Sequence, residues 1–309
     1  MFNVHTIIDG FTITNGSAGH GGGIYYLNSS GTIANNTITS NLALHGGGVH
    51  CNSSSPAIRQ NTFQSNTTLQ EGGAIFGWDS SPLISCNKFL DNDGGDHGGA
   101  IALEDDSEPV IVNNLFIGNY VEGTGGGAIN ALNAVPCIVN NTFVGNSASA
   151  GLWGPGDGGA VILRSTTGVR MYNNIFYDNH AEGHGNSVFA DQDCGTQSIE
   201  FCDAFNPAPP NTDVSHYAWL NPSTLLFEVI PGLEAGNCLH ADPSFADTID
   251  YRLGANSPCT DKGINPGNPS YPNVPTTDME IKHRPVDIPD VGNDEGNAFC
   301  DMGAYEIQQ

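Results

Sequence analysis

The sequence predicts an all-β fold, a right-handed single-stranded parallel β-helix of about seven or eight coils with a C-terminal capping segment. Three observations predict it: a repeat of about 26 residues, short strand-like fragments bounded by Gly, Asn and Ser, and the absence of helical segments from the repeat. A fixed period in this range indicates stacked units, none of which can bury its apolar face alone.

The first element of the repeat is a pair of glycines followed by small or aliphatic residues. Glycine accepts positive φ angles and close backbone approach, so we expect this phrase to form one corner of each coil. The copies are Gly22-Gly23-Ile24, Gly47-Gly48-Val49, Gly72-Gly73-Ala74-Ile75, Gly98-Gly99-Ala100-Ile101, Gly126-Gly127-Ala128-Ile129 and Gly158-Gly159-Ala160-Val161.

The second element is a phrase in which two asparagines flank an apolar residue. Parallel stacking places equivalent residues about 4.8 Å apart. We therefore expect an internal apolar ladder between two amide ladders, because stacked Asn side chains can hydrogen-bond one another and the turn backbone. The apolar residues are Ile38, Phe63, Phe89, Phe116, Phe143 and Phe176, within the phrases Asn36–Asn41, Asn61–Asn66, Asn87–Asn92, Asn114–Asn119, Asn141–Asn146 and Asn174–Asn179.

The repeat divides the chain into residues 1–206, the β-helix, and residues 207–309, an irregular disulfide-containing cap expected to pack on the helix end. An insertion at residues 147–157 should form a loop on one face. Of eight cysteines, five lie between residues 194 and 300, and none form a C-x-x-C pair. We expect disulfides there, and hence an oxidising compartment.

The composition narrows the range of partners. The chain has 33 acidic and eight basic residues (Lys and Arg) and a net charge of −25, which argues against nucleic acid and against unassisted binding of polyanionic polysaccharide. No apolar run is long enough for a transmembrane helix. The first residues run directly into strand-like sequence, so we expect an export signal to lie outside this sequence.

The Gly-Gly-Ala-Ile phrase paired with Phe-x-x-Asn resembles the repeats of polymorphic outer-membrane proteins and related secreted β-helix proteins, over residues 19 to about 190. The phrase Asp301-Met302-Gly303-Ala304-Tyr305-Glu306 is similar to the C-terminal segment of surface-anchored bacterial β-helix proteins. The resemblance implies an extracellular or cell-surface location and, for several relatives, adhesion. The wider superfamily includes polysaccharide lyases and polygalacturonases, so the fold alone does not choose a function.

Candidate catalytic residues follow the glycine corner. Trp78, Glu104 and Arg164 share one coil position, and Asp79 and Asp105 share the next. Carboxylates on neighbouring coils are how a β-helix hydrolase would assemble its acid and base. Trp78, with Trp153 from the insertion, could stack on a sugar ring. The alternative is an ordinary acidic surface.

Two candidate metal sites are also present, although no cofactor is required. His20, His45, Glu71 and His97 precede the glycine corners, which suggests a metal site, a pH-sensitive strip, or simply turn closure. Asp91, Asp93 and Asp96 form an acidic loop with glycines that could bind calcium. A similar loop spans residues 287–295.

Together these features favour an extracellular or cell-surface scaffold that is not catalytic and that binds glycans, mediates adhesion or self-associates. One alternative is a polysaccharide hydrolase or lyase with its site at Asp79, Glu104, Asp105 and Arg164. Another is a calcium-dependent extracellular structural module.

Overall fold

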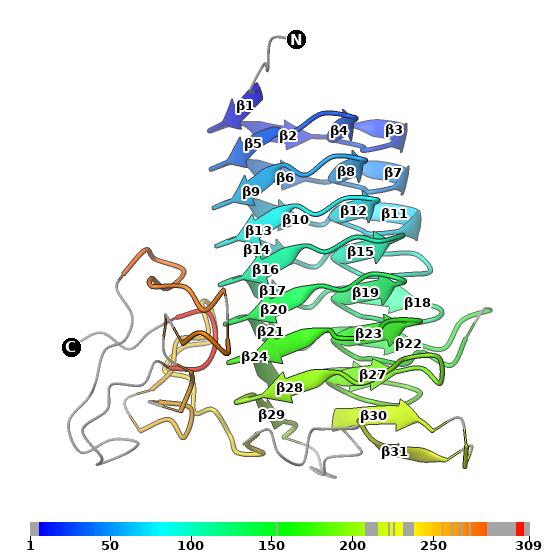
Figure 1. Ribbon diagram of the computed structural model, residues 1–309. Helices are drawn as coiled ribbons and strands as arrows, with labels where there is room; N and C mark the ends of the chain where they lie inside the picture. The colour runs from blue at the N-terminus through cyan, green and yellow to red at the C-terminus, as the bar shows by residue number, and fades with distance from the viewer. Residues whose placement is uncertain are drawn as a thin grey trace.

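The computed structural model is a parallel β-helix of about eight coils, as predicted (Figure 1). It describes residues 6–152, 154–207, 216–221, 223–224, 226–230, 238–254, 256–260, 262–264, 266, 268–271, 273–282 and 301–305. Among these residues, no helix is long and apolar enough to cross a membrane.

A regular coil passes through four sheets, A to D, and successive coils pair in parallel register. The coil of residues 83–104 contributes only isolated bridges, at Asp93 and His97, between the two parts of sheet C. Sheet A contains β1 (Thr6–Asp9), β5 (Gly31–Ala34), β9 (Ala57–Arg59), β13 (Leu83–Ser85), β16 (Val110–Val112), β20 (Cys137–Val139), β24 (Arg170–Tyr172) and β28 (Ser198–Glu200). Sheet B contains β2 (Thr12–Thr14), β6 (Thr37–Thr39), β10 (Thr62–Gln64), β14 (Lys88–Leu90), β17 (Leu115–Ile117), β21 (Thr142–Val144), β25 (Ile175–Tyr177) and β29 (Asp203–Phe205).

Sheets C and D meet at the glycine corner. Sheet C has two parts, β3 (Ser17–His20), β7 (Leu42–His45) and β11 (Thr67–Glu71), and then β18 (Tyr120–Glu122), β22 (Ser147–Ser149) and β26 (His180–Ala181). Sheet D contains β4 (Ile24–Leu27), β8 (Val49–Asn52), β12 (Ile75–Trp78), β15 (Ile101–Glu104), β19 (Ile129–Leu132), β23 (Val161–Arg164), β27 (Val188–Ala190), β30 (Tyr217–Leu220) and the antiparallel β31 (Phe227–Val229).

The strands are short because the chain turns through left-handed backbone at four places in a regular coil. In the coil of β9 to β12 these turn residues are Gln60, Ser65, Gly72 and Asp79, with φ angles of 56°, 51°, 69° and 47°. Gly, Asn and Asp tolerate this region best, which explains why they are abundant. At the glycine corner, a Cβ on Gly73 would lie 2.3 Å from the carbonyl oxygen of Gly99, so the predicted role of the glycine pair is confirmed.

The predicted apolar ladder is confirmed along sheet B. Phe63, Phe89, Phe116, Phe143 and Phe176 are fully buried, and their rings stack with centroids 4.6 to 5.0 Å apart. Ile38 begins the same column, paired in register with Phe63. This column lies in the main core with the inward side chains of sheets A and D.

The two amide ladders are confirmed as well. In each ladder the side-chain oxygen of one Asn accepts bonds from the backbone N–H and the side-chain amide of the Asn one coil earlier, as Asn87 Oδ1 does from Asn61 at 2.9 and 3.0 Å. Each ladder is therefore a continuous hydrogen-bonded column that satisfies buried turn backbone.

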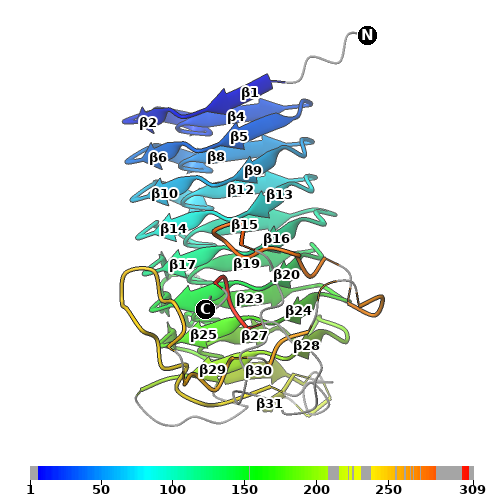
Figure 2. The same cartoon turned by 90° about the vertical axis from the view of Figure 1, so that its left-hand side faces the viewer.

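The C-terminal part of the chain extends the helix and then turns back along it. Strands β28 and β29 complete sheets A and B before residue 206, and β30, past that predicted boundary, adds one more parallel strand to sheet D. The described residues from 239 onward lie beside sheets A and B rather than only at the helix end (Figures 1 and 2). Lys88 Nζ lies 2.5 Å from Asp250 Oδ1, and Asn113 Nδ2 donates to the Thr277 carbonyl at 2.7 Å.

The cysteine thiols are mostly buried. Cys51, Cys137, Cys194, Cys202 and Cys259 are free thiols in this structure, so none of them forms a predicted disulfide here.

Candidate functional site

The most distinctive feature is a column of sheet D side chains that point away from the core. It lies at the glycine corner, where sheet C packs against sheet D. Strand alternation sends every second side chain of sheet D away from the core. Most of these outward side chains are nevertheless buried, because sheet C covers them. We call this column and the residues that border it the corner strip. The column comprises Tyr25, His50, Phe76, Ala102, Asn130, Ile162 and Phe189.

One border of the corner strip is the predicted histidine and acid column. Bridges place His20 beside His45, His45 beside Glu71, and Glu71 beside His97 on successive coils. The His20 and His45 rings stack at 5.3 Å, and His45 Nδ1 lies 2.8 Å from Glu71 Oε2. Within the described part of the chain, no group of three or more His, Cys, Asp or Glu side chains is arranged to hold a metal ion.

The first coils of the strip are aromatic. The His50 ring lies 4.9 to 5.0 Å from the rings of Tyr25, Phe76 and His20, and the Phe76 ring lies 6.4 Å from that of Trp78. His50 is 2% exposed, and neither ring nitrogen has a hydrogen-bond partner in the described structure. Burial, with the nearby His20 and His45, lowers the pKa of His50 to about 3. Burial and Arg164 lower the pKa of His97 to about 4, so these two imidazoles stay neutral near neutral pH.

We expect His50→Phe to make the protein less sensitive to acid. The unfolded chain takes up the His50 proton near its ordinary pKa of 6.5, whereas the folded chain does so only near 3, so stability is lost as the pH falls through this window. When the pH falls from about 7 to about 4, the unfolding free energy of the parent should drop by about 2–3 kcal/mol more than that of the variant. Urea unfolding at both pH values measures this. His180→Phe, at an exposed site, is the control, and equal acid sensitivity of parent and His50→Phe would contradict the assignment.

The opposite border of the strip contains Trp78, Glu104 and Arg164. The register confirms that they share a column, with Trp78 next to Glu104 and Leu132 between Glu104 and Arg164. Glu104 is 8% exposed. Burial, together with the charges of Glu71 and Asp105, raises the pKa of its carboxyl to about 7 against the opposing charge of Arg164.

Arg164 reaches across the strip. Its guanidinium donates to Thr124 Oγ1 at 3.0 Å and to the Thr124 carbonyl oxygen, on the sheet C side. Burial lowers its pKa, against the opposing charges of Asp191, Asp157 and Glu104. Arg164 therefore links the two borders of the strip.

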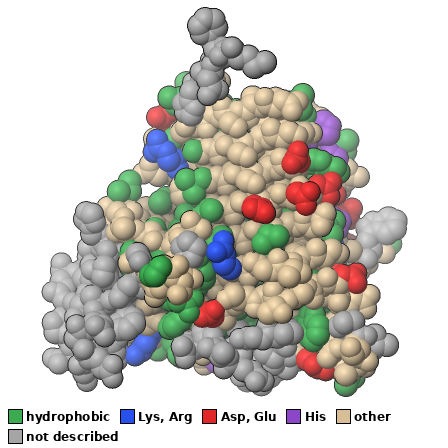
Figure 3. All heavy atoms as spheres, in the orientation of Figure 1, with side chains coloured by type: hydrophobic (Ala, Val, Ile, Leu, Met, Phe, Trp, Pro, Cys, Tyr) green, Lys and Arg blue, Asp and Glu red, His purple; other side chains and the backbone are tan. Residues whose placement is uncertain are grey.

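The other two predicted catalytic acids occupy turn positions. Asp79 and Asp105 both have φ of 47°, in the column that also holds Ser53 and Asn133. Asp79 Oδ2 accepts a bond from Ser53 Oγ at 3.2 Å. The left-handed backbone accounts for a short polar residue at these positions. Figure 3 shows acidic side chains gathered near the position of β12 and β15 in Figure 1, with histidine at the edge of this face.

The strip opens into a pocket of about 380 Å³ over its later coils. Ile162 and Phe189 line it from the outward column, Asp157 and His184 from the sheet C side, and Arg164 and Asp191 from the other side. His184 Nδ1 lies 3.0 Å from Asp157 Oδ1.

Sequence reasoning missed the outward column itself, above all Asn130. Asn130 is fully buried, and no described residue bonds to either atom of its side-chain amide. The alternation of β19, in which Ile129 and Ala131 point into the core, could have identified it.

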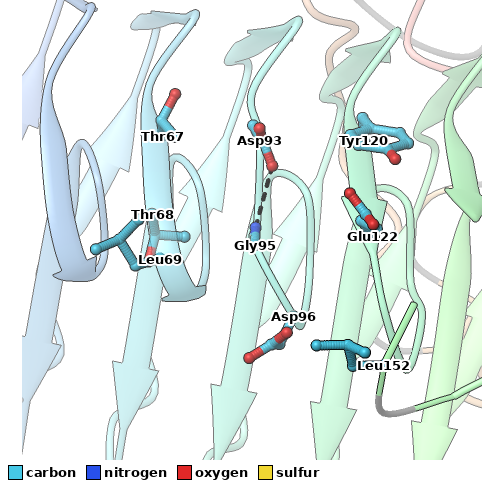
Figure 4. A pocket seen from close by; sticks show the side chains of 9 residues that line it. All are labelled: Thr67, Thr68, Leu69, Asp93, Gly95, Asp96, Tyr120, Glu122 and Leu152. Carbon is cyan, nitrogen blue, oxygen red and sulfur yellow. Dashed lines mark hydrogen bonds between the residues drawn. The ribbon is translucent and has the colours of Figure 1, made fainter.

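A second pocket, of about 340 Å³, lies on sheet C and contains two of the predicted calcium ligands (Figure 4). Asp93 and Asp96 line it with Tyr120, Glu122 and Leu152, and Asp93 Oδ1 accepts the Gly95 N–H at 3.1 Å. Asp91 does not line it and occupies a left-handed turn position with φ of 51°. Calcium binding stays a prediction. Trp153 and the acidic loop at 287–295 lie outside the described residues.

Comparison with known proteins yields one match. A family model described as a right-handed beta helix region matches residues 2–176, more than half of the chain. No curated protein and no solved structure matches the chain significantly.

Proposed function

The chain belongs to the right-handed β-helix family, and on this premise we propose that it is an extracellular or cell-surface scaffold whose corner strip binds a glycan chain without cleaving it. The location is part of the proposal and rests on the resemblance of the repeat and of the C-terminal segment to secreted proteins.

One observation carries the proposal: the strip runs along the helix axis, with exposed aromatic rings on its first coils and a pocket on its later coils. Trp78 and Tyr25 are both 42% exposed, so their ring faces are open to a sugar ring. His50 and Asn130 lie beneath this surface and have no hydrogen-bond partner among the described residues. Tyr25 and Trp78 lie two coils apart along the axis, about 10 Å at a strand spacing of about 4.8 Å, which suits an extended polymer.

Binding without cleavage is favoured because the described carboxyls whose charges act on Glu104 have structural roles. Glycoside hydrolysis needs two carboxyl groups that flank the bond. Asp79 and Asp105 are accounted for by the turn backbone, and Glu71 is engaged by His45 at 2.8 Å.

We expect Trp78→Ala to weaken binding of a glycan oligomer about tenfold, since it removes an exposed stacking surface. Tyr120→Ala, an aromatic change in the sheet C pocket, is the matched control and should leave affinity unchanged. A glycan array identifies the oligomer, and isothermal titration measures the affinities. The proposal fails if no glycan binds, or if Tyr120→Ala has the larger effect.

A polysaccharide hydrolase is the second candidate, and Glu104 favours it. A carboxyl with a pKa of about 7 is partly protonated at neutral pH and could donate a proton to a leaving oxygen. A depolymerisation screen with Glu104→Gln and Asp105→Asn tests this candidate. Turnover that Glu104→Gln abolishes would replace the non-catalytic assignment with the hydrolase.

A further inference from the structure

Two cysteines lie side by side where the chain leaves the last coil of the helix. The sequence leads us to expect disulfides in this part of the chain but leaves the pairing open. Strand register decides it for one pair, because Asp203 of β29 and Leu239 form a parallel bridge. The Leu239 N–H donates to the Cys202 carbonyl at 2.7 Å, and the Ala204 N–H donates to the Leu239 carbonyl at 3.1 Å. Cys202 and Cys238, which precede the bridged residues, are therefore neighbours as well.

The side chains of this pair point the same way, into the core. Cys202 is fully buried in the main core cluster with Ala204, and Cys238 packs against that cluster. Leu239, the next residue, points the other way and packs beside Leu253 in a separate cluster. Neighbouring parallel strands lie about 4.8 Å apart, within the range of about 4.4–6.8 Å between the Cα atoms of a disulfide.

The two sulfur atoms also share their surroundings. Cys202 Sγ donates to the Glu200 carbonyl at 3.4 Å, and Cys238 Sγ donates to the adjacent Ile199 carbonyl at 3.7 Å. Burial, together with a hydrogen bond to the Cys238 thiol, raises the pKa of the Cys202 thiol. Cys238 is half-buried, so it meets a reagent first while Cys202 stays protected behind it.

The other described cysteines of this region are directed elsewhere. Cys259 Sγ donates to Asp203 Oδ2 at 3.1 Å, on the side of β29 that faces away from the core. Cys194 Sγ donates to the Leu163 carbonyl of sheet D at 3.3 Å. Cys202 Sγ lies instead beside carbonyls of sheet A. Cys238 is thus the partner that the register gives to Cys202.

We propose that Cys202 and Cys238 form a disulfide that fastens the chain after residue 238 to the last coil of the helix. The Cys238 thiolate attacks a small disulfide, such as oxidised glutathione, and a mixed disulfide forms as one glutathione leaves. The Cys202 thiol then loses its proton, and its sulfur displaces the second glutathione from Cys238. The protein gives up two hydrogen atoms, and one oxidised glutathione becomes two reduced molecules.

This bond closes residues 203–237 into a loop that contains β30 and β31, the last strands of sheet D. It holds whatever the corner strip binds, because neither cysteine belongs to that strip. It needs an oxidising compartment, in agreement with the location proposed above.

The first test is a peptide map of the oxidised protein. The folded chain is incubated with oxidised glutathione until its thiol content is constant. The remaining thiols are then blocked with N-ethylmaleimide in denaturant, and the unreduced peptides are analysed by mass spectrometry. We expect the peptides of Cys202 and Cys238 to be joined. Recovery of both cysteines as blocked thiols, or of either joined to another cysteine, would overturn the inference.

The second test measures what the bond does for the fold. Oxidised parent should melt about 5 °C above oxidised Cys238→Ser, because the bond restricts the unfolded chain. After reduction with dithiothreitol the two should melt within about 1 °C of each other. Cys194→Ser, at another buried cysteine of the same core cluster, is the matched control and should keep the joined peptides. Equal melting of the two oxidised proteins, or loss of the joined peptides in Cys194→Ser, would contradict the proposed bond.

Discussion

Asn114→Ala is expected to lower the unfolding free energy by about 4 kcal/mol. The Asn114 side-chain oxygen accepts the backbone N–H and the side-chain amide of Asn87, at 2.9 and 3.1 Å. Its own amide donates to the Ile84 carbonyl at 2.9 Å and to Asn141 Oδ1 at 3.0 Å. Alanine leaves buried donors and an acceptor unpaired at once, and each such group costs about 1–3 kcal/mol. Urea unfolding followed by circular dichroism gives the value.

The control for this change is Asn35→Gly, at the turn residue that directly precedes Asn36 of the amide ladder. Asn35 is an exposed turn residue with φ of 55°, a conformation that glycine accepts. It should change stability by no more than about 0.5 kcal/mol. If Asn114→Ala costs no more than Asn35→Gly, the amide ladder is not a main source of stability.

Phe116→Ala is expected to cost about 3–5 kcal/mol. Its ring is fully buried and stacks on those of Phe89 and Phe143, with centroids 4.6 and 4.7 Å away. Truncation removes the buried apolar surface and leaves a cavity that the rigid neighbouring coils cannot close. The same unfolding experiment measures the loss.

Two further variants separate packing from the mere loss of a phenylalanine. Phe11→Ala removes a ring that is 60% exposed at the first coil, and it should cost less than about 1 kcal/mol. Phe116→Ile places in the column the residue type that Ile38 already provides, and it should restore most of the lost stability. A loss for Phe116→Ala as small as that for Phe11→Ala would contradict the internal ladder.

The coil architecture could be predicted because each column is repeated many times in the sequence. The glycine corner, the apolar ladder and both amide ladders depend on local backbone conformation and on stacking in register, which the period reveals directly. The same register predicted that four side chains lie next to one another on successive coils: His20, His45, Glu71 and His97.

The site was harder to predict because its burial depends on how sheets C and D meet. His50 and Asn130 occupy outward strand positions, which ordinarily face solvent, and only the covering sheet makes them buried and unpaired. The sequence suggested Asp79 and Asp105 as catalytic acids. Asp is also favoured at turn positions with left-handed backbone, so the residue type alone does not separate the two roles. The C-terminal segment has no period, so its position beside sheets A and B could not be predicted from the repeat.

The most direct test of the account is a crystal structure of this chain with a bound glycan oligomer. We expect the oligomer to lie along the corner strip, with a sugar ring on Trp78 and a polar group within hydrogen-bond distance of Glu104. An oligomer bound instead in the sheet C pocket beside Tyr120, with the corner strip unoccupied at saturating concentration, would contradict it.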